Sequence, residues 1–233
     1  MITMTNEIEK ITERYERRKT MVGGRYARFN QEIMAGTQER QRALVSLLRA
    51  QGISDLSDLK ILEVGCGSGA NLQELLLLGA QPENLVGNEL LPERVAQARR
   101  MLPQAVRIVA GDASALSFEE GAFDIVYQST VFTSILDDEL QARIAGSMWR
   151  WVKPGGGIPW YDFTFNNPKN PDVRGVPLRR IGELFPEGIV EARRVTLAPP
   201  ISRRVCKFHP ILYPVFNSIP LLRTHLLCWI RKK

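Results

Sequence analysis

The sequence predicts an α/β fold with a mostly parallel sheet and helices on both of its faces. Two observations predict it. Between residues 61 and 164, short apolar runs typical of strands alternate with amphipathic runs typical of helices. One such strand leads directly into glycines at positions 65, 67 and 69 and then into a helix. This alternation is typical of parallel strands joined by crossover helices, which bind ligands beyond the carboxyl ends of their strands.

The expected elements follow one another at short intervals. Residues 1–36 are polar with a helical tendency, and Leu44, Leu47 and Leu48 form the apolar face of a helix over 38–51. Pro92 suits the first turn of a helix, and Asp137 or Asp138 can cap another. The predicted helices are 70–78, 92–102 and 138–151, and the predicted strands are 61–65, 85–89, 106–110, 123–128, 157–164, 190–197 and 225–230.

The glycine turn indicates a nucleoside cofactor. Glycine lets a ligand approach the backbone, because it has no Cβ. Glu63 lies two residues before the turn, where a carboxylate would repel a pyrophosphate but attract the charged α-amino group of S-adenosylmethionine. A dinucleotide stays the alternative, because Gly65, Gly67 and Ala70 also fit its pattern and Glu89 follows about 20 residues later.

Further motifs follow the turn in a fixed order. They are Glu89 at the end of the second strand of the alternation, Gly-Asp-Ala at 111–113, Phe-Asp-Ile-Val at 123–126 and Lys-Pro-Gly-Gly at 153–156. With the turn, they resemble the class I S-adenosylmethionine-dependent methyltransferase family, in particular its bacterial small-molecule members. The resemblance covers roughly 59–165. It implies a Rossmann-like fold with a seven-stranded, mostly parallel sheet whose last strand is antiparallel.

The resemblance also implies how the chain binds S-adenosylmethionine and its product S-adenosylhomocysteine. Glu63 and the turn take the amino-acid end, Glu89 the ribose hydroxyls, and Asp112 with the N–H of Ala113 the adenine. Residues 128–130 lie beside the methyl group, and Tyr26 closes over the site. The predicted cofactor-binding residues are Tyr26, Glu63, Gly65, Cys66, Gly67, Gly69, Glu89, Leu90, Asp112, Ala113, Gln128, Ser129 and Thr130, with no metal.

A hydroxyl acceptor would need a base to remove its proton, and histidine suits that task. His209 could reach the site if its segment forms a lid, whereas His225 is expected to be structural. Asp162, at the end of a predicted strand, is the other candidate for a catalytic role.

The C-terminal part differs in composition from the rest. From residue 172 onward there are twelve Lys or Arg and four Asp or Glu, a charge of +8, whereas the whole chain carries +6. Residues 199–223 are also rich in apolar side chains. Three explanations stay open for this segment: a lid over the substrate cleft, contact with a membrane or lipid, and a homodimer contact. Its prolines and Arg223 argue against a transmembrane helix.

Three parts are expected: a helical segment over the cofactor site (1–52), a cofactor-binding core (53–198), and the insertion with the last strand (199–233). Three cysteines without a CxxC pair suggest neither a zinc site nor a disulfide framework, and the expected location is the cytoplasm, with membrane contact through the tail. No nucleic acid is expected as partner. The expected activity is methyl transfer to a small-molecule, lipid-linked or glycan-linked acceptor, most naturally at a hydroxyl. An NAD-dependent oxidoreductase and a non-catalytic nucleoside-binding module are the alternatives.

Overall fold

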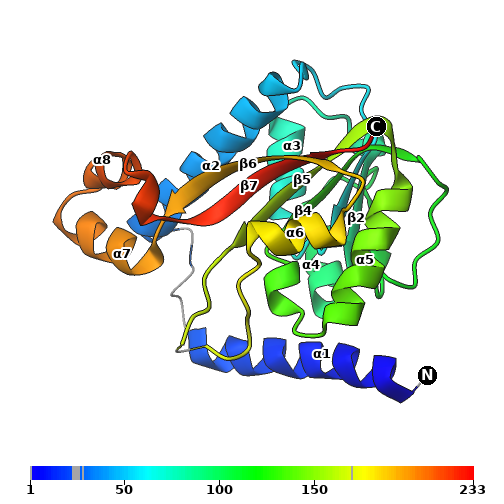
Figure 1. Cartoon of the computed structure of the whole chain (residues 1–233), viewed down its shortest axis with the longest axis horizontal. Coiled ribbons are helices and arrows are strands. Elements are labelled where there is room, and N and C mark those ends of the chain that lie inside the picture. Colours follow the sequence, from blue (N-terminus) through cyan, green and yellow to red (C-terminus); the bar gives the residue numbers. More distant parts are fainter. Residues whose placement is uncertain (1, 23–26, 28, 169) are drawn as a thin grey trace.

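A seven-stranded sheet forms the centre of the molecule (Figure 1). The computed structural model describes residues 2–22, 27, 29–168 and 170–233. The strands lie in the order β3-β2-β1-β4-β5-β7-β6, and β7 pairs antiparallel with both of its neighbours. This confirms the predicted sheet. The strands are β1 Ile61–Val64, β2 Leu85–Glu89, β3 Arg107–Ala110, β4 Phe123–Ser129, β5 Val152–Phe163, β6 Ile189–Leu197 and β7 Arg223–Arg231.

Helices cover both faces of the sheet, and each face has its own apolar core. One core joins α2, α3 and α4 to the sheet through residues such as Leu47, Leu72 and Val95. The other joins α5 and α6 through residues such as Met148 and Ile181. The helices are α2 Gln31–Ala50, α3 Ala70–Leu77, α4 Pro92–Met101, α5 Asp138–Trp151 and α6 Leu178–Leu184, with short 3-10 turns η1 Pro82–Asn84 and η2 Phe132–Ser134.

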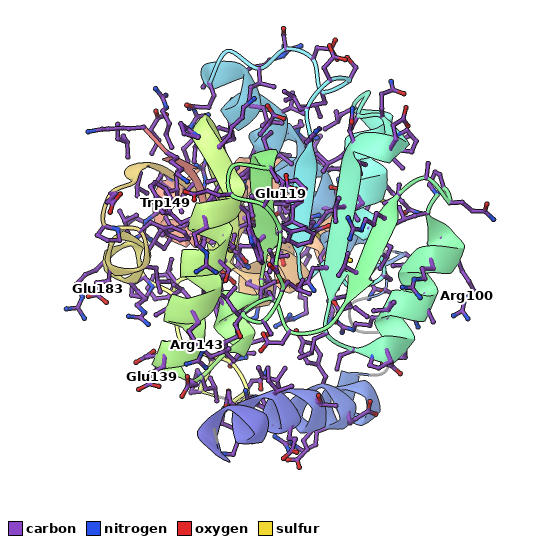
Figure 2. The ribbon with its side chains drawn as sticks, turned by 90° about the vertical axis from the view of Figure 1, so that its right-hand side faces the viewer. Arg100, Glu119, Glu139, Arg143, Trp149 and Glu183 are labelled. Carbon is purple, nitrogen blue, oxygen red and sulfur yellow. The ribbon has the colours of Figure 1, made fainter. Side chains whose placement is uncertain are left out.

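The first helix, α1 (Ile2–Val22), lies across one end of this layered core. In Figure 2 it crosses beneath the other elements, on the side of Glu139 near the start of α5 and away from Trp149 near its end. Its buried Ile11 joins the core of the α5 face. The helix therefore covers the carboxyl ends of the parallel strands.

Local signals explain most element boundaries. Asp137 caps α5, its side chain accepting a hydrogen bond from the backbone N–H of Leu140 at 2.6 Å, and Pro92 begins α4. Two boundaries differ from the prediction by five residues or more. The second helix starts at Gln31, seven residues earlier than expected. Strand β5 starts at Val152, because the predicted turn at 153–156 is part of this strand as an irregularity, with a register shift against β4 and a positive φ of 78° at Gly155.

The apolar insertion folds into α7 (Pro199–Phe208), α8 (Leu212–Asn217) and η3 (Pro220–Leu222). We call this segment, 199–222, the apolar lobe; it projects at one end of the molecule (Figure 1). Val205, Cys206 and Tyr213 form its small core together with Leu197 of β6. Within the part of the chain that the structure describes, no helix is both long and apolar enough to cross a membrane.

Candidate cofactor site

A cavity of about 410 Å³ opens where β1, β2 and β4 end. Nine of the thirteen predicted cofactor residues line it. They come from four separate turns, which lie together at the carboxyl ends of the strands because these strands run parallel. These nine residues are Gly65, Cys66, Gly67, Glu89, Leu90, Asp112, Ala113, Ser129 and Thr130.

The three glycines of the turn have different roles. All have positive φ, between 58° and 88°. A Cβ on Gly65 would lie 2.4 Å from Val131 Cγ2, and one on Gly69 would lie 2.6 Å from Leu102 Cδ1. A Cβ on Gly67 would meet nothing closer than the Arg94 side chain at 4.0 Å. Gly65 and Gly69 are therefore required by packing, and Gly69 does not line the cavity. Gly67 is the glycine that leaves room for a ligand.

Glu89 holds the turn against the end of β2. One of its carboxylate oxygens accepts a hydrogen bond from the N–H of Gly67 and the other from the N–H of Leu91, each at 2.8 Å. The side chain is buried and fixed by these two bonds, and it still lines the cavity. Each carboxylate oxygen has further lone pairs, so Glu89 can also accept from a diol.

Asp112 follows β3 and lines the same cavity. Its carboxylate accepts hydrogen bonds from the N–H of Ser114 at 2.8 Å and from the Ser114 hydroxyl at 2.6 Å. This Asx-type turn fixes the orientation of the side chain. Ala113 is buried beside it, and both residues line the cavity.

Glu63 lies behind the turn as a buried carboxyl. One oxygen accepts a hydrogen bond from the amide of Asn71 at 2.5 Å, and the other, although buried, has no hydrogen-bond partner among the described residues. Burial raises the pKa of Glu63 to about 8. Asn71 lines the cavity, whereas the predicted cofactor residue Glu63 does not and reaches it only past Asn71 and the turn. A buried carboxyl group with an unpaired oxygen ionises favourably beside a cationic group, whereas a phosphate beside it would oppose its ionisation.

The sequence motifs did not predict Arg40 as a site residue. It lies on α2 and lines the cavity. Its guanidinium donates to Asn71 Oδ1 at 2.8 Å, to Ser129 Oγ at 3.2 Å and to Glu74 at 3.3 Å. Nothing in the sequence distinguishes Arg40 from the neighbouring arginines of the same helix. Tertiary packing alone brings this cation to the glycine turn.

Residues 61–156 match a family model described as a methyltransferase domain. This segment is similar to the methyltransferase domain of the S-adenosylmethionine-dependent family. The site fits this family, because the glycine turn, Glu89 and Asp112 line one cavity, with the unpaired oxygen of Glu63 behind the turn.

Two relatives and one solved structure illustrate the match. An uncharacterized methyltransferase of Synechocystis sp. is 35% identical over 97 residues, which is 42% of this chain and 43% of the relative. The 2-methyl-6-phytyl-1,4-hydroquinone methyltransferase of the same organism is 32% identical over 120 residues, 51% of this chain and 35% of the relative. The chain thus matches less than half the length of these relatives. An S-adenosylmethionine-dependent methyltransferase from Mesorhizobium loti shares the fold, with a TM-score of 0.58 and 16% identity over 79% of this chain and 95% of that one.

The cavity lining does not include Gln128 or Asp162. Gln128 donates to Asp162 Oδ2 at 3.0 Å, and Thr133 donates to Asp162 Oδ1 at 2.8 Å. Gln128 Oε1 also accepts from the N–H of Val131 at 3.2 Å. Both side chains are fully buried, and burial raises the pKa of Asp162 to about 7. The pair joins β4, β5 and η2 behind the cavity wall, so its geometry favours a positioning role over the predicted contacts with cofactor or acceptor.

The two histidines also lie off the described cavity wall. His209 is exposed between α7 and α8, and its Nδ1 accepts a hydrogen bond from the N–H of Ile211 at 3.2 Å. Its catalytic role stays a prediction that this geometry does not support. The His225 ring stacks on Tyr161 with 4.9 Å between the centroids, and burial lowers its pKa to about 4. Tyr26 lies outside the described residues.

Helix α1 closes the far side of the cavity. Ile8, Ile11 and Tyr15 line it, and the Arg94 guanidinium lies 4.4 Å from the centre of the Tyr15 ring. The Tyr15 hydroxyl donates to the Ser134 hydroxyl at 3.3 Å. Helix α1 thus lies where the predicted helical segment over the cofactor site is expected, and the division into three parts stays a prediction.

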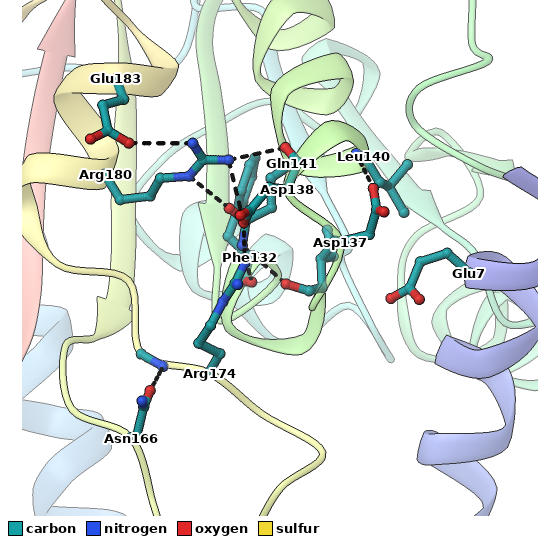
Figure 3. Close-up of polar contacts among 12 residues, drawn as sticks. Glu7, Phe132, Asp137, Asp138, Leu140, Gln141, Asn166, Arg174, Arg180 and Glu183 are labelled. Atoms are coloured by element: carbon teal, nitrogen blue, oxygen red, sulfur yellow. Dashed lines mark hydrogen bonds and ion pairs between the residues drawn. The ribbon is translucent and has the colours of Figure 1, made fainter. Parts of the chain in front are cut away.

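A polar network fixes the outer side of the same wall (Figure 3). Gln141 of α5 donates to the carbonyl oxygens of Phe132 and Ile135, each at 3.0 Å, and Arg180 donates to Gln141 Oε1 at 3.1 Å. Arg174 pairs with Asp138 at the start of α5. These contacts hold the turn after β4 in place from outside, as Asp162 does from behind.

Proposed function

We propose that this chain binds S-adenosylmethionine in the cavity and transfers its methyl group to a small or lipid-linked acceptor. The buried, unpaired oxygen of Glu63 beside the glycine turn is the observation that carries the proposal. The α-ammonium group of S-adenosylmethionine would satisfy that oxygen, directly or through water, whereas a dinucleotide would leave it unpaired. Bound there, the cofactor supplies a methyl group that its positively charged sulfur already activates.

The contribution of the chain is binding and alignment. Glu89 would accept from the ribose hydroxyls, Asp112 from the adenine amino group, and Arg40 would pair with the carboxylate at the amino-acid end. Ser129 and Thr130, at the end of β4, lie at the wall where an acceptor would meet the methyl group. Holding two reactants in line can lower the activation barrier by about 7–11 kcal/mol.

The acceptor group we propose is a hydroxyl of the phenol type. Neither Asp162 nor His209 lines the described cavity wall, so an acceptor that ionises easily suits the site better than an aliphatic alcohol. A phenol, with a pKa near that of tyrosine, about 10, meets this need. The relative that is named for a phytylated hydroquinone supports an acceptor that joins a phenol ring to a lipid chain. A glycan-linked acceptor is less well supported.

The proposed partners follow from this choice. The acceptor is a small or lipid-linked molecule, and nucleic acid is not among the partners. None of the residues that line the cavity belongs to the apolar lobe, so a lid is the least supported of the three explanations for this segment. A membrane and a second copy of the chain are the other two, and they predict different results with vesicles.

An acceptor screen tests the activity. The purified protein is incubated with S-adenosylmethionine and a panel of hydroquinones, alcohols, amines, RNA and protein, and S-adenosylhomocysteine is quantified. We expect product with a phenolic acceptor, and none from the Gly67→Val variant, whose side chain would occupy the cavity. Methylation of RNA or protein alone would contradict the proposed acceptor. Cofactor binding without product from any acceptor would favour a non-catalytic module.

A further inference from the structure

The outer face of the apolar lobe exposes large apolar side chains. They are Phe208, Ile211, Val215, Phe216, Ile219 and Leu221, exposed by 36% to 89%. The inner face of the same helices is already occupied by the contact with Leu197 and α2. Several large apolar side chains exposed on one short segment of a folded domain indicate a binding surface.

The charged residues of the lobe itself are all cations, and the nearby acids Glu32 and Glu39 belong to α2, against which the lobe packs. Arg203, Arg204 and Lys207 lie on α7, and the sequence contains no Asp or Glu from residue 192 to residue 233. An anionic partner would complement these cations. A symmetric contact between two copies would instead bring the same cations together without acids from this segment to pair them. Charge thus favours an anionic partner over a second chain.

The lobe also lies at the end of the sheet where the parallel strands have their carboxyl ends. It leads directly into β7, whose His225 pairs with Phe163 at the carboxyl end of β5. The methyltransferase cavity opens at the carboxyl ends of β1, β2 and β4, on the same edge. A surface on which the lobe rests would therefore lie on the side of the molecule where an acceptor reaches the methyl group.

We propose that the lobe docks on a bilayer containing anionic lipids. Its apolar side chains enter the headgroup boundary, and the cations of α7 contact lipid phosphates. This is peripheral docking by two short helices. The inference does not depend on the proposed chemistry, because vesicle binding requires neither cofactor nor acceptor.

Vesicle flotation tests the inference. The full chain is mixed with vesicles of phosphatidylcholine, with or without phosphatidylglycerol, and the bound fraction is measured at low and high salt. We expect binding to the anionic vesicles that salt weakens. Leu221→Asp should lower the partition coefficient about tenfold or more, since it places a charge among the lipid chains. Leu77→Asp is the matched control, because Leu77 on α3 is exposed to 87% against 89% for Leu221.

A second pair of variants tests the charge. Arg204→Glu should weaken binding to anionic vesicles, and Arg100→Glu, which changes an exposed arginine of α4 (Figure 2), should have a smaller effect. If the chain bound neither kind of vesicle, the proposal would be overturned. The same holds if Leu221→Asp and Leu77→Asp lowered vesicle binding equally. A dimer in light scattering that Leu221→Asp converts to a monomer, without vesicle binding, would assign the lobe to a second copy instead.

Discussion

Glu63 is a carboxyl whose protonation depends on what lies beside it. In the ligand-free protein, burial raises its pKa to about 8, so the group is largely protonated at pH 7. A bound ammonium group would favour the charged carboxylate and lower that pKa.

Binding of S-adenosylmethionine at pH 7 should therefore release up to about one proton from Glu63. Calorimetric titration in two buffers with different ionisation enthalpies measures this release. Glu63→Gln keeps the shape of the side chain and should abolish the release. An unchanged release in that variant would assign the proton to another group.

Arg40 can be tested with two ligands that differ only at one end. Arg40→Met should weaken binding of S-adenosylhomocysteine by about 1.5–3 kcal/mol, the usual loss for a hydrogen bond to a charged group. It should change binding of methylthioadenosine, which has no amino-acid end, much less. Arg49→Met, on the exposed part of the same helix, is the control. Equal losses for both ligands would show that Arg40 acts by holding Asn71 and Glu74.

The β1–α3 turn separates structural glycine from ligand-binding glycine. Gly67→Ala and Gly69→Ala both place a side chain at positive φ, which costs about 1–2 kcal/mol. Gly69→Ala also forces Leu102 to move and should cost a further ~1–3 kcal/mol.

Thermal unfolding should thus show a lower Tm for Gly69→Ala than for Gly67→Ala, by roughly 2–4 °C for each kcal/mol of difference. Gly67→Ala should lose the larger share of cofactor affinity. The reverse order in either measurement would contradict the assignment of the two glycines.

At the level of elements, the sequence predicts what depends on local pattern. Strand and helix periods, the glycine turn and the cap at Asp137 are local, and the elements that they predict are present. The seven-residue helix α6 was missed because it is too short to show a helical period. Gln128 and Asp162 were expected at the cavity but bond to each other, because the pairing of β4 with β5 decides which way side chains at the strand ends point. Arg40 depends in the same way on how α2 packs.

The stability of the whole molecule should depend on pH through three buried groups. The folded-state pKa values are about 8 for Glu63 and about 7 for Asp162, both raised by burial, and about 4 for His225, lowered by burial. Stability from a raised carboxyl pKa is present below its unfolded value and is lost as pH rises through the folded value. His225 acts in the opposite direction, but only below its unfolded pKa of 6.5.

The free energy of unfolding of the ligand-free protein should therefore fall by about 1–2 kcal/mol between pH 6.5 and 8. Urea unfolding at a series of pH values measures this. Glu63→Gln should flatten the dependence over that interval, whereas Asp162→Asn should flatten mainly its lower part. Stability that rises with pH across this range would contradict the burial of a protonated Glu63.

The most direct test of the central claim is calorimetric titration of the purified protein with S-adenosylmethionine, S-adenosylhomocysteine and NADH in parallel. The cavity formed by the glycine turn, Glu89 and Asp112, with the unpaired oxygen of Glu63 behind it, predicts binding of the first two ligands and none of NADH. Asp112→Ala should weaken the first two by about 1–3 kcal/mol. Binding of NADH, without binding of S-adenosylmethionine, would contradict the claim and the role assigned to Glu63.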